Sequence, residues 1–521
     1  MPRYKDYSYE QSKLLPVAFD RQILPGTFEY TLNHLIDHEV DLAAFDEPYQ
    51  NDDTGAPAYD PRILLKIVLF AYSRGIFTSR RIEQACRENV VFMALSADTC
   101  PHWTTIADFI STRHEAIAVL FREVLLVCDT LGLLGKELFA IDGCKLSSNA
   151  AKEWSGTHAD LQKKHQKLEQ AIRVMLDRHR EEDARGGEAP GRARDAQYLD
   201  TVRRQVSKIK QFLATQPENV GPKGTIRQSN ITDPESAKMK TSHGVVQGYT
   251  GVAAVDAKHQ VIVHAEAHGE GQEHGLLRPT VEAVRETVRS ISDDDNIFTT
   301  ATLTADAGYH TEANMQYVCE EGIDAYIADR AMRQRDPRFA DADRHKVRHR
   351  EERRQQARRK TDGRTPLFTP ADFRHDPAQQ TCVCPAGRRL YKNGSHITIR
   401  GFTGVKFRGA KSVCGPCGLR AQCLKRPDTT PVRQVVFFSG RSPRAPETFT
   451  AKMQRKIDSV VGKLIYRQRL ATAEPPFAHL RHAKGLHRFT VRGKMKVTTQ
   501  WRLYCLVHNL FKVHQFGPGF A

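Results

Sequence analysis

Hydrophobic residues recur at helical spacing through the first 135 positions of the chain. The spacing predicts helices over 62–73, 80–92 and 105–128, with turns at Arg74-Gly75 and at 98–101. Thr105 and Asp108 have the pattern of a capping box at the start of the third helix. Short helices joined by tight turns are compatible with a helix-turn-helix over 79–114, and equally with a plain helical bundle.

After this helical segment the pattern changes to short buried strands. Residues 138–141 predict a strand that delivers Asp142 at its end, and 245–255 with 260–268 predict a hairpin. Helices are expected at 275–290 and 312–321, around a strand at 297–304 that delivers Asp306, and a last strand at 325–328. This succession predicts an α/β fold with a mixed sheet. In such sheets functional residues gather at strand ends.

Two segments interrupt this pattern. Apolar spacing over 161–176 and 199–213, with a Gly/Pro break at 186–191, predicts an antiparallel helical hairpin inserted at about 150–225. An arm that contacts protein or DNA, or a solvated spacer, would both have this pattern. Residues 331–440 are basic and Cys-rich, and 344–360 hold nine Lys/Arg and two Glu. The expected domains are therefore 1–135, 136–330, 331–440 and 441–521, with helices returning in the last and ending at 498–513.

The composition restricts the class of protein. The 521 residues are 40% hydrophobic and carry 78 Lys+Arg against 61 Asp+Glu, a formal charge of +17. These values exclude a disulfide-rich mini-protein, a collagen-like fibre and a mostly disordered chain. Apolar runs are too short for a membrane span, and the opening residues lack a signal-peptide pattern, so an intracellular protein is expected. The positive charge favours a polyanionic partner, although solubility alone would also explain it.

The cysteines divide into scattered and clustered groups. Six of the eleven lie in apolar stretches and are expected to be small buried hydrophobic residues: Cys86, Cys100, Cys128, Cys144, Cys319 and Cys505. The other five are Cys382, Cys384, Cys414, Cys417 and Cys423. Cys414 and Cys417 have the Cys-x-x-Cys spacing of a zinc knuckle. A four-thiolate zinc site from Cys382, Cys384, Cys414 and Cys417, with Cys423 as a substitute, is predicted, with free thiols as the alternative.

Three carboxylates are candidates for a catalytic metal site. Asp142 and Asp306 each follow a predicted strand, and Glu474 stands among cations and aromatic residues in 464–477. Divalent metals that act on phosphate need carboxylates converging from rigid elements. Any one of the three taken alone also fits a turn former or a helix cap.

Several motifs, in order along the chain, carry a resemblance to a known family. They are Tyr59-Asp60-Pro61-Arg62, Ile141-Asp142-Gly143, Asn230-Ile231-Thr232-Asp233-Pro234-Glu235, Gln247-Gly248-Tyr249, Ala305-Asp306-Ala307-Gly308-Tyr309, the cysteine cluster, and the stretch from Tyr466 to Lys512. In this order and spacing the chain resembles the transposases of bacterial insertion sequences that use an Asp-Asp-Glu triad. It is most similar to the insertion-sequence eleven-eighty-two family, in the group marked by a Tyr, Arg, Glu, Lys signature.

The resemblance implies a ribonuclease H-like core in which Asp142, Asp306 and Glu474 hold two Mg²⁺ ions. It implies a Mg-dependent transposase that cleaves the ends of its own element and joins them to target DNA. The implied partners are the terminal inverted repeats, target DNA and a second copy of the chain in the DNA complex, and the implied location is the bacterial cytoplasm at the nucleoid. The DNA-binding residues of the signature region would be Tyr466, Arg467, Arg469, Arg481 and Lys484.

The signature region departs from the pattern of the larger group in two places. The gap between Arg469 and Glu474 is one residue longer, and Arg481 stands where a lysine is usual. Glu474 also precedes Pro475-Pro476, and a residue before proline is pushed out of the helical region. We therefore expect one helix to end near Thr472 and another to begin at the prolines.

Two rival functions share part of this pattern. A metal-dependent nuclease of the same architecture would cleave DNA without joining it. A zinc-containing DNA-binding protein without catalysis would keep only the cysteines and the basic charge. The presence of all three carboxylates argues against the second rival.

Overall fold

A computed structural model gives the arrangement of the chain. It describes residues 17–47, 49, 57–184, 192–221, 224–241, 244–292, 294, 296–339, 367–399, 402–441 and 447–519. The chain divides into two compact units, Met1–Asp329 with Met453–Ala521, and Arg330–Lys452. The basic run at 344–360 lies outside the described residues.

The N-terminal part of the first unit is helical, as the apolar spacing predicts. Two of the expected helices are each divided in two, because Asn89 caps a new helix by accepting from the amides of Val91 and Phe92, and because a break falls at Arg113. The capping box at Thr105 is wrong, since His102 is the N-cap of that helix. The helices are α1 (Phe28–His34), α2 (Ala43–Asp46), α3 (Pro61–Ser73), α4 (Ser79–Glu88), α5 (Val90–Leu95), α6 (Trp103–Thr112) and α7 (His114–Thr130).

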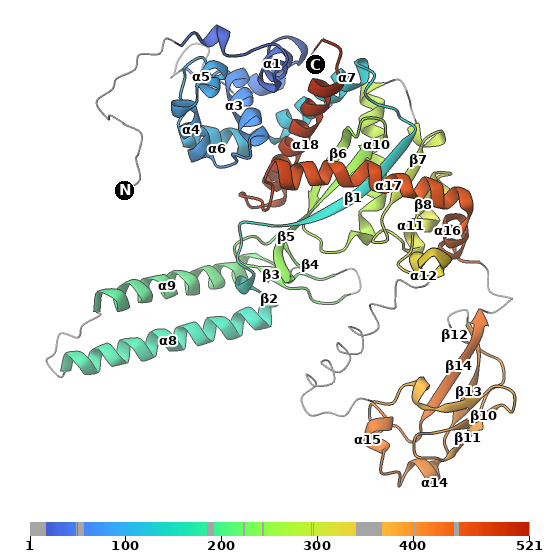
Figure 1. Ribbon diagram of the computed structural model, residues 1–521. Helices are drawn as coiled ribbons and strands as arrows, with labels where there is room; N and C mark the ends of the chain where they lie inside the picture. The colour runs from blue at the N-terminus through green and yellow to red at the C-terminus, as the bar shows by residue number, and fades with distance from the viewer. Residues whose placement is uncertain are drawn as a thin grey trace, which may run out of the picture. The chain divides into compact units, whose positions relative to one another are not determined.

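A mixed six-stranded sheet forms the centre of the first unit (Figure 1). β5 pairs antiparallel with β1, β4 and β6, whereas β7 and β8 run parallel to β1. The predicted hairpin is confirmed. The predicted end of the first strand at Asp142 is wrong, because β5 continues to pair with β1 as far as Ser147. The strands are β1 (Leu138–Ser147), β4 (Ala237–Thr241), β5 (Gly244–Asp256), β6 (Ile262–His268), β7 (Thr302–Ala305) and β8 (Asp324–Ile327).

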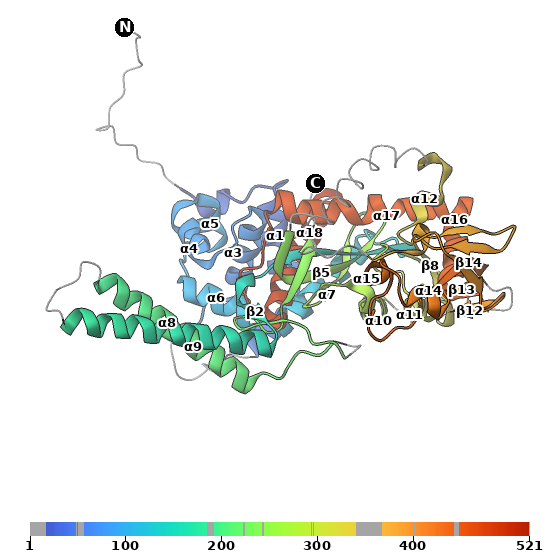
Figure 2. The same ribbon diagram turned by 90° about the horizontal axis from the view of Figure 1, so that it is seen from below.

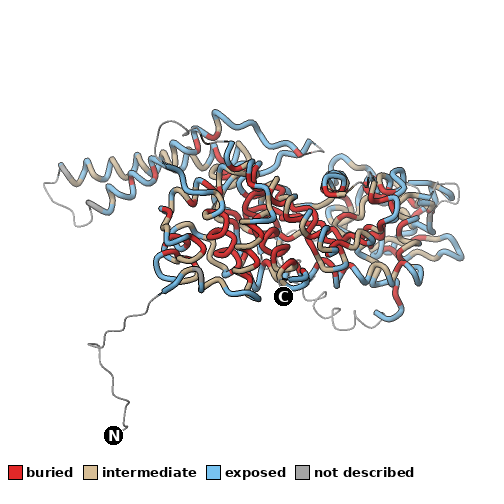
Figure 3. The backbone as a smooth tube through the Cα atoms, turned by 90° about the horizontal axis from the view of Figure 1, so that it is seen from above, coloured by how far each residue is buried: buried red, intermediate tan, exposed pale blue. Residues whose placement is uncertain are grey.

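Helices from distant parts of the chain cover this sheet. α17 (Val460–Ala478) crosses in front of the strands in Figure 1 and contacts β1, β5, β7 and β8, while α18 (Lys494–Phe516) packs on β6, α3 and α7. The indole of Trp501 in α18 is fully buried and donates to the carbonyl of Val252 at 2.9 Å. Figure 3 shows the buried positions gathered in this sheet and its helices. The remaining helices are α10 (Leu277–Ile291), α11 (Glu312–Glu320) and α16 (Phe449–Asp458).

The inserted helices form a long arm. α8 (His158–Ala184) and α9 (Arg192–Thr215) lie side by side and extend away from the sheet (Figure 2). β2 (Ser155–Gly156) and β3 (Ser229–Asn230) pair where the arm leaves the sheet, beside an apolar cluster of Leu161, Ile209 and Phe212. The predicted Gly/Pro break at 186–191 lies outside the described residues.

The second unit contains a separate antiparallel sheet. In the described part of this unit, the core cluster is small and consists of five buried residues: Phe373, Cys382, Leu390, Phe407 and Val435. The elements are α12 (Met332–Arg335), β9 (Arg374–Asp376), β10 (Thr381–Val383), β11 (Arg389–Lys392), β12 (Ile397–Ile399), β13 (Phe402–Arg408), α14 (Lys411–Cys414), α15 (Arg420–Cys423) and β14 (Gln434–Arg441).

Candidate functional site

Two of the predicted carboxylates lie next to each other in the central sheet. β1 and β7 are parallel, and Ile141 stands opposite Ala305. The residues that follow these two positions are Asp142 and Asp306, which therefore lie side by side. The Asp142 carboxylate accepts from the Gly143 amide at 2.8 Å, and the Asp306 carboxylate accepts from the Gly308 amide at 2.7 Å. Strand pairing therefore brings together two residues that are far apart in the sequence.

Arg469 of α17 reaches the same place. Its Nη1 donates to Oδ2 of Asp142 at 2.8 Å, and its guanidinium lies 5.8 Å from the centre of the Tyr466 ring. Burial raises the pKa of Asp142, and the nearby Arg469 opposes this rise. Of the predicted DNA-binding side chains, Arg469 thus pairs with Asp142 and Tyr466 lies beside the Arg469 guanidinium.

A third carboxylate, Glu273, lies against this pair and was not predicted. Its Oε1 would lie 3.1 Å from a Cβ at Gly143, and its Oε2 would collide with a Cβ at Gly308, so two glycines leave the space that it fills. The loop is fixed because His274 contacts the Gly308 carbonyl through Nδ1 at 2.5 Å. Burial and the charges of Asp306 and Asp142 raise the pKa of Glu273 to about 7, although Lys145 lowers it.

The sequence contained a signal for Glu273. It follows strand β6 by a short loop and precedes α10, so it is an acidic residue after a strand, like the two aspartates. The apolar pattern of this segment predicts only the approach to a helix. Tyr309 lies close to the three carboxylates: burial and the charges of Glu273, Asp142 and Asp306 all raise its pKa. Among the described residues its buried hydroxyl has no hydrogen-bond partner.

Glu474 stands apart from this group. α17 continues without a break from Val460 to Ala478, so the expected end near Thr472 is wrong. Five residues along a regular helix correspond to a rotation of about 140°, which turns Glu474 away from the Arg469 face. Ala473 occupies that face and is fully buried, whereas Glu474 is exposed.

A side chain from the sheet explains why the helix tolerates its prolines. Pro475 lacks the amide that would bond the carbonyl of Ala471, four residues earlier. Nε2 of Gln260, in the β5–β6 turn, donates to that carbonyl at 2.9 Å instead. The helix therefore continues past Pro475 without leaving this acceptor unsatisfied.

The other predicted DNA-binding residues divide by exposure. Arg467 on α17 and Arg481 in the π-helical turn His479–Ala483 are exposed. Lys484 is buried and donates to the carbonyl of Ser73 at 3.0 Å, with its ammonium 3.5 Å from the centre of the Phe511 ring. This geometry makes Lys484 a link between α3 and α18, and its role as a DNA contact stays a prediction.

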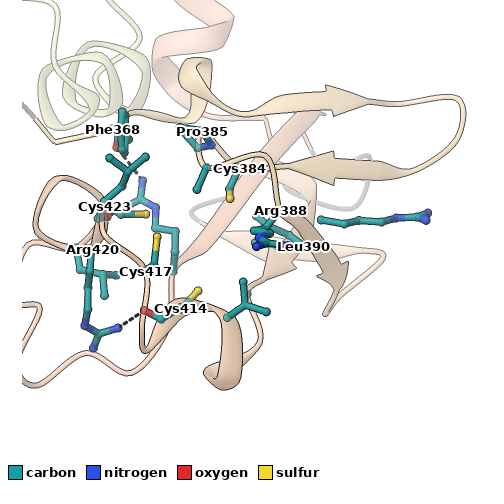
Figure 4. A pocket seen from close by; sticks show the side chains of 16 residues that line it. Phe368, Cys384, Pro385, Arg388, Leu390, Cys414, Cys417, Arg420 and Cys423 are labelled. Carbon is teal, nitrogen blue, oxygen red and sulfur yellow. Dashed lines mark hydrogen bonds between the residues drawn. The ribbon is translucent and has the colours of Figure 1, made fainter.

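Four of the five clustered cysteines surround one cavity in the second unit (Figure 4). Cys384, Cys414, Cys417 and Cys423 line a space of about 30 Å³. Cys382 is fully buried in the apolar core instead, where burial raises its pKa to about 11. The four cysteines that lie together therefore differ from the predicted ligand set by one residue, with Cys423 in place of Cys382. Of the six scattered cysteines, Cys319 is exposed and Cys100 is half-buried, contrary to expectation, whereas the other four are buried.

Neither cluster already has ligand geometry. In the part of the chain that the structure describes, no three His, Cys, Asp or Glu side chains have the spacing of ligands to one metal ion. The carboxylate group supplies only oxygen donors, which suit Mg²⁺, and the thiol group supplies sulfur, which suits Zn²⁺.

Two segments of the chain match models of known protein families. Residues 383–514 match a transposase DDE domain, and residues 17–112 match a transposase domain (DUF772). Glu474 lies inside the first segment, whereas Asp142 and Asp306 lie between the two. No curated protein matches the chain. Both matches support the same class, DNA transposases, which are enzymes that act on DNA. Among the described residues, no helix has the length and apolar character needed to cross a bilayer.

Proposed function

We propose that this chain is the transposase of an insertion sequence of the eleven-eighty-two family, which cleaves the ends of its element and joins them to target DNA. The observation that carries the proposal is the adjacency of Asp142 and Asp306 on neighbouring parallel strands. The strand order, with three antiparallel strands followed by two parallel ones, fits a ribonuclease H-like core. The two transposase-domain matches support the class.

The acidic group fits a divalent metal. Asp142, Asp306 and Glu273 offer oxygen donors, and the space left by Gly143 and Gly308 keeps Glu273 close to both aspartates. Three nearby carboxylates repel one another, and a cation relieves that repulsion. Bound Mg²⁺ would lower the pKa of the attacking water or hydroxyl and stabilise charge on the leaving oxygen.

The protein's own residues then bind and orient the DNA. Arg469 sits at the acidic group with its guanidinium on Asp142, so a bound ion would release it to hold a phosphate oxygen. Exposed Arg467 and Arg481 supply further cations. We assign recognition of the terminal repeats to the N-terminal helices and to the basic insertion at 331–440. We expect the DNA complex to contain a homodimer, at the bacterial nucleoid.

Two residues compete for the third carboxylate. The resemblance selects Glu474, which lies within the matched DDE segment, and the packing selects Glu273. We favour Glu273 in the conformation described, because Glu474 is exposed on a different face of α17 from Arg469.

The test uses the purified full-length chain, Mg²⁺ and a DNA that carries both flanks of its own gene. Wild-type protein should cleave at the element ends and join them to a target plasmid. Asp142→Asn and Asp306→Asn keep nearly the same volume and should lower cleavage about 10³-fold while gel-shift affinity persists. Glu273→Gln and Glu474→Gln are compared in parallel, and the third ligand is the one whose loss matches the aspartate variants.

The rivals give different outcomes in the same assay. Cleavage without joining would identify a nuclease. DNA binding without cleavage, unchanged in the aspartate variants, would identify a DNA-binding protein without catalysis and would overturn the proposal.

A further inference from the structure

The four cysteines around one cavity form the strongest cluster that the proposed function does not use. They come from three separate segments: Cys384 from the turn between β10 and β11, Cys414 and Cys417 from the α14 region, and Cys423 from the end of α15. All four line the same cavity, which brings the three segments together. Figure 4 shows their sulfurs directed toward the same space.

The backbone around the thiols keeps this space open. A Cβ at Gly409 would collide with the sulfur of Cys414, so only glycine leaves room for it there. In the turn between β10 and β11, the amide of Cys384 donates a hydrogen bond to the carbonyl of Arg388 at 2.9 Å. The amide of Gly387, whose φ is 72°, donates to the Cys384 carbonyl at 2.8 Å. The turn thereby holds Cys384 at the edge of the cavity.

The charges around the cavity suit a dianionic centre. Four thiolates around Zn²⁺ carry a net charge of about −2, and Arg388, Arg420 and Arg433 line the same cavity. Arg433 donates to the carbonyl of Cys423 at 3.1 Å, so its guanidinium lies beside this cysteine. Within the described residues the buried Nε of Arg433 has no hydrogen-bond partner, which leaves one donor available to a thiolate.

We propose that Cys384, Cys414, Cys417 and Cys423 bind one structural Zn²⁺, and that Cys382 is an apolar core residue rather than a ligand. The cavity of about 30 Å³ has room for an ion. Binding draws the thiolates in to about 2.3 Å from the metal and joins three segments around a five-residue core. Small domains with little apolar core commonly depend on such a metal.

Metal content of the purified, reduced full-length chain tests this proposal. Elemental analysis should find about one zinc per chain, and Co²⁺ exchange should give the absorption of a tetrahedral thiolate site. Cys423→Ser should lose most of the metal, whereas Cys382→Ala, the matched control, should keep it. Cys423→His should retain metal because imidazole is also a zinc ligand, and this separates lost ligation from misfolding.

Two results would overturn the proposal. The first is a reduced wild-type chain that takes up no Zn²⁺ or Co²⁺. The second is a Cys382→Ala chain that loses as much metal as Cys423→Ser, which would return Cys382 to the ligand set.

A different observation in the same sheet carries a second inference. β11, β13 and β14 present one face away from the apolar core, because Leu390, Phe407 and Val435 occupy the other. Three large aromatic side chains stand exposed there: Tyr391, Phe402 and Phe438, with exposed fractions of 48%, 47% and 53%. Phe402 and Phe438 are in edge contact at 6.2 Å, so their rings share this face.

Positive charge accompanies these aromatic rings. Lys406 and Arg408 alternate with the core residues of β13, and Arg408 stands opposite Tyr391. Residues 367–441 hold 13 Lys+Arg and 3 Asp+Glu, so this segment carries 13 − 3 = +10 of the formal charge. Arg408 pairs with Tyr391, and Gly404 pairs with Phe438. These two positions of β13 are four residues apart, about 13 Å, so the rings are spread along the sheet. Aromatic rings spread along a cationic sheet are typical of surfaces that stack the bases of a single strand.

We infer that this face binds an unpaired DNA strand, by base stacking on Phe402, Phe438 and Tyr391 and by phosphate contacts to the adjacent cations. The inference rests on the proposed function for its biological occasion, since an unpaired strand arises when element ends are cut.

Binding of a fluorescent oligothymidylate by the full-length chain tests the inference without any transposition. Phe402→Ala and Phe438→Ala should each weaken single-strand binding about tenfold and change duplex affinity less than twofold. Tyr198→Ala removes an equally exposed aromatic residue of the arm and should leave both affinities unchanged. Unchanged single-strand affinity in both phenylalanine variants would overturn the inference. So would a change in oligomeric state alone, which would make the face a contact between copies of the chain.

Discussion

The two sheets of this protein are stabilised by different means. In the first unit β1, β5 and β6 are buried over most of their length, and helices such as α18 pack a fully buried tryptophan against them. Among the described residues of the second unit, the core cluster of the sheet contains five buried residues, and its loops are held by polar links. Arg420 alone donates to the carbonyls of Cys414, Pro427, Thr430 and Pro431. The comparison shows that a sheet with little apolar burial needs specific links between its loops.

Removing zinc should produce the largest difference in stability between the two sheets. Apparent zinc affinity in small zinc domains corresponds to about 10–16 kcal/mol, so a chelator should unfold the second sheet and leave the first intact. Hydrogen exchange of the full-length chain should rise about 10²-fold or more in β10, β11 and β13, with no change in β1 and β5. Earlier loosening of the first sheet would contradict the comparison.

Truncating Trp501 should have the next largest effect, in the opposite unit. Trp501→Ala removes a fully buried indole and its bond to Val252, and should lower the free energy of unfolding of the first unit by about 3–5 kcal/mol. Calorimetry gives the measurement. Phe407→Ala, the matched change in the second unit, should leave the transition of the first unit where it was.

The acidic group should make the first unit sensitive to pH. The pKa of Glu273 is about 7 in the fold and near 4.5 when unfolded, so the folded state holds its proton more tightly. Glu273 therefore contributes stability that is fully present below pH 4.5 and is lost as the pH rises through 7, up to about 3 kcal/mol. Unfolding followed at several pH values should show this loss in the wild type and not in Glu273→Gln. An identical pH dependence in both chains would show that Glu273 is not held near the aspartates.

The smallest effect concerns the prolines of α17. Gln260→Asn shortens the side chain that bonds the Ala471 carbonyl and should cost about 1 kcal/mol in denaturant unfolding. Pro475→Ala restores the helical donor to that carbonyl. In a double-mutant cycle, Gln260→Asn should therefore cost less in the Pro475→Ala background. Equal costs in both backgrounds would mean that the amide does not support the helix.

The sequence predicted the elements better than the contacts between them. Apolar periodicity identified the hairpin of β5 and β6, the helix near α10 and the arm, because each is a local pattern. It missed the full length of β1, since pairing as far as Ser147 depends on β5, about a hundred residues away. The predicted break before Pro475 is wrong for the same reason, because the side chain that bonds the Ala471 carbonyl comes from Gln260, which is distant in the sequence.

The candidate site was predicted in part. Asp142 and Asp306 were identified by one rule, an acidic residue after a strand, and their adjacency follows from the register of β1 and β7. Glu273 obeys the same rule, but the four residues 269–272 separate it from the end of β6. Nothing in the sequence around Lys484 marks it as buried. Choosing Cys423 over Cys382 required knowing that Cys382 is fully buried in the apolar core, whereas Cys423 lines the cavity.

The chain leaves the central sheet after β8 and returns to it at α16, and these two places adjoin. Lys456 of α16 pairs with Asp324 of β8 at 2.5 Å and lies 4.2 Å from the centre of the Tyr326 ring. An inserted module whose two ends are anchored side by side can be exchanged, enlarged or deleted without changing the path of the strands around it. For an engineer, the junctions near Asp329 and Met453 are the positions at which to graft a different DNA-binding module.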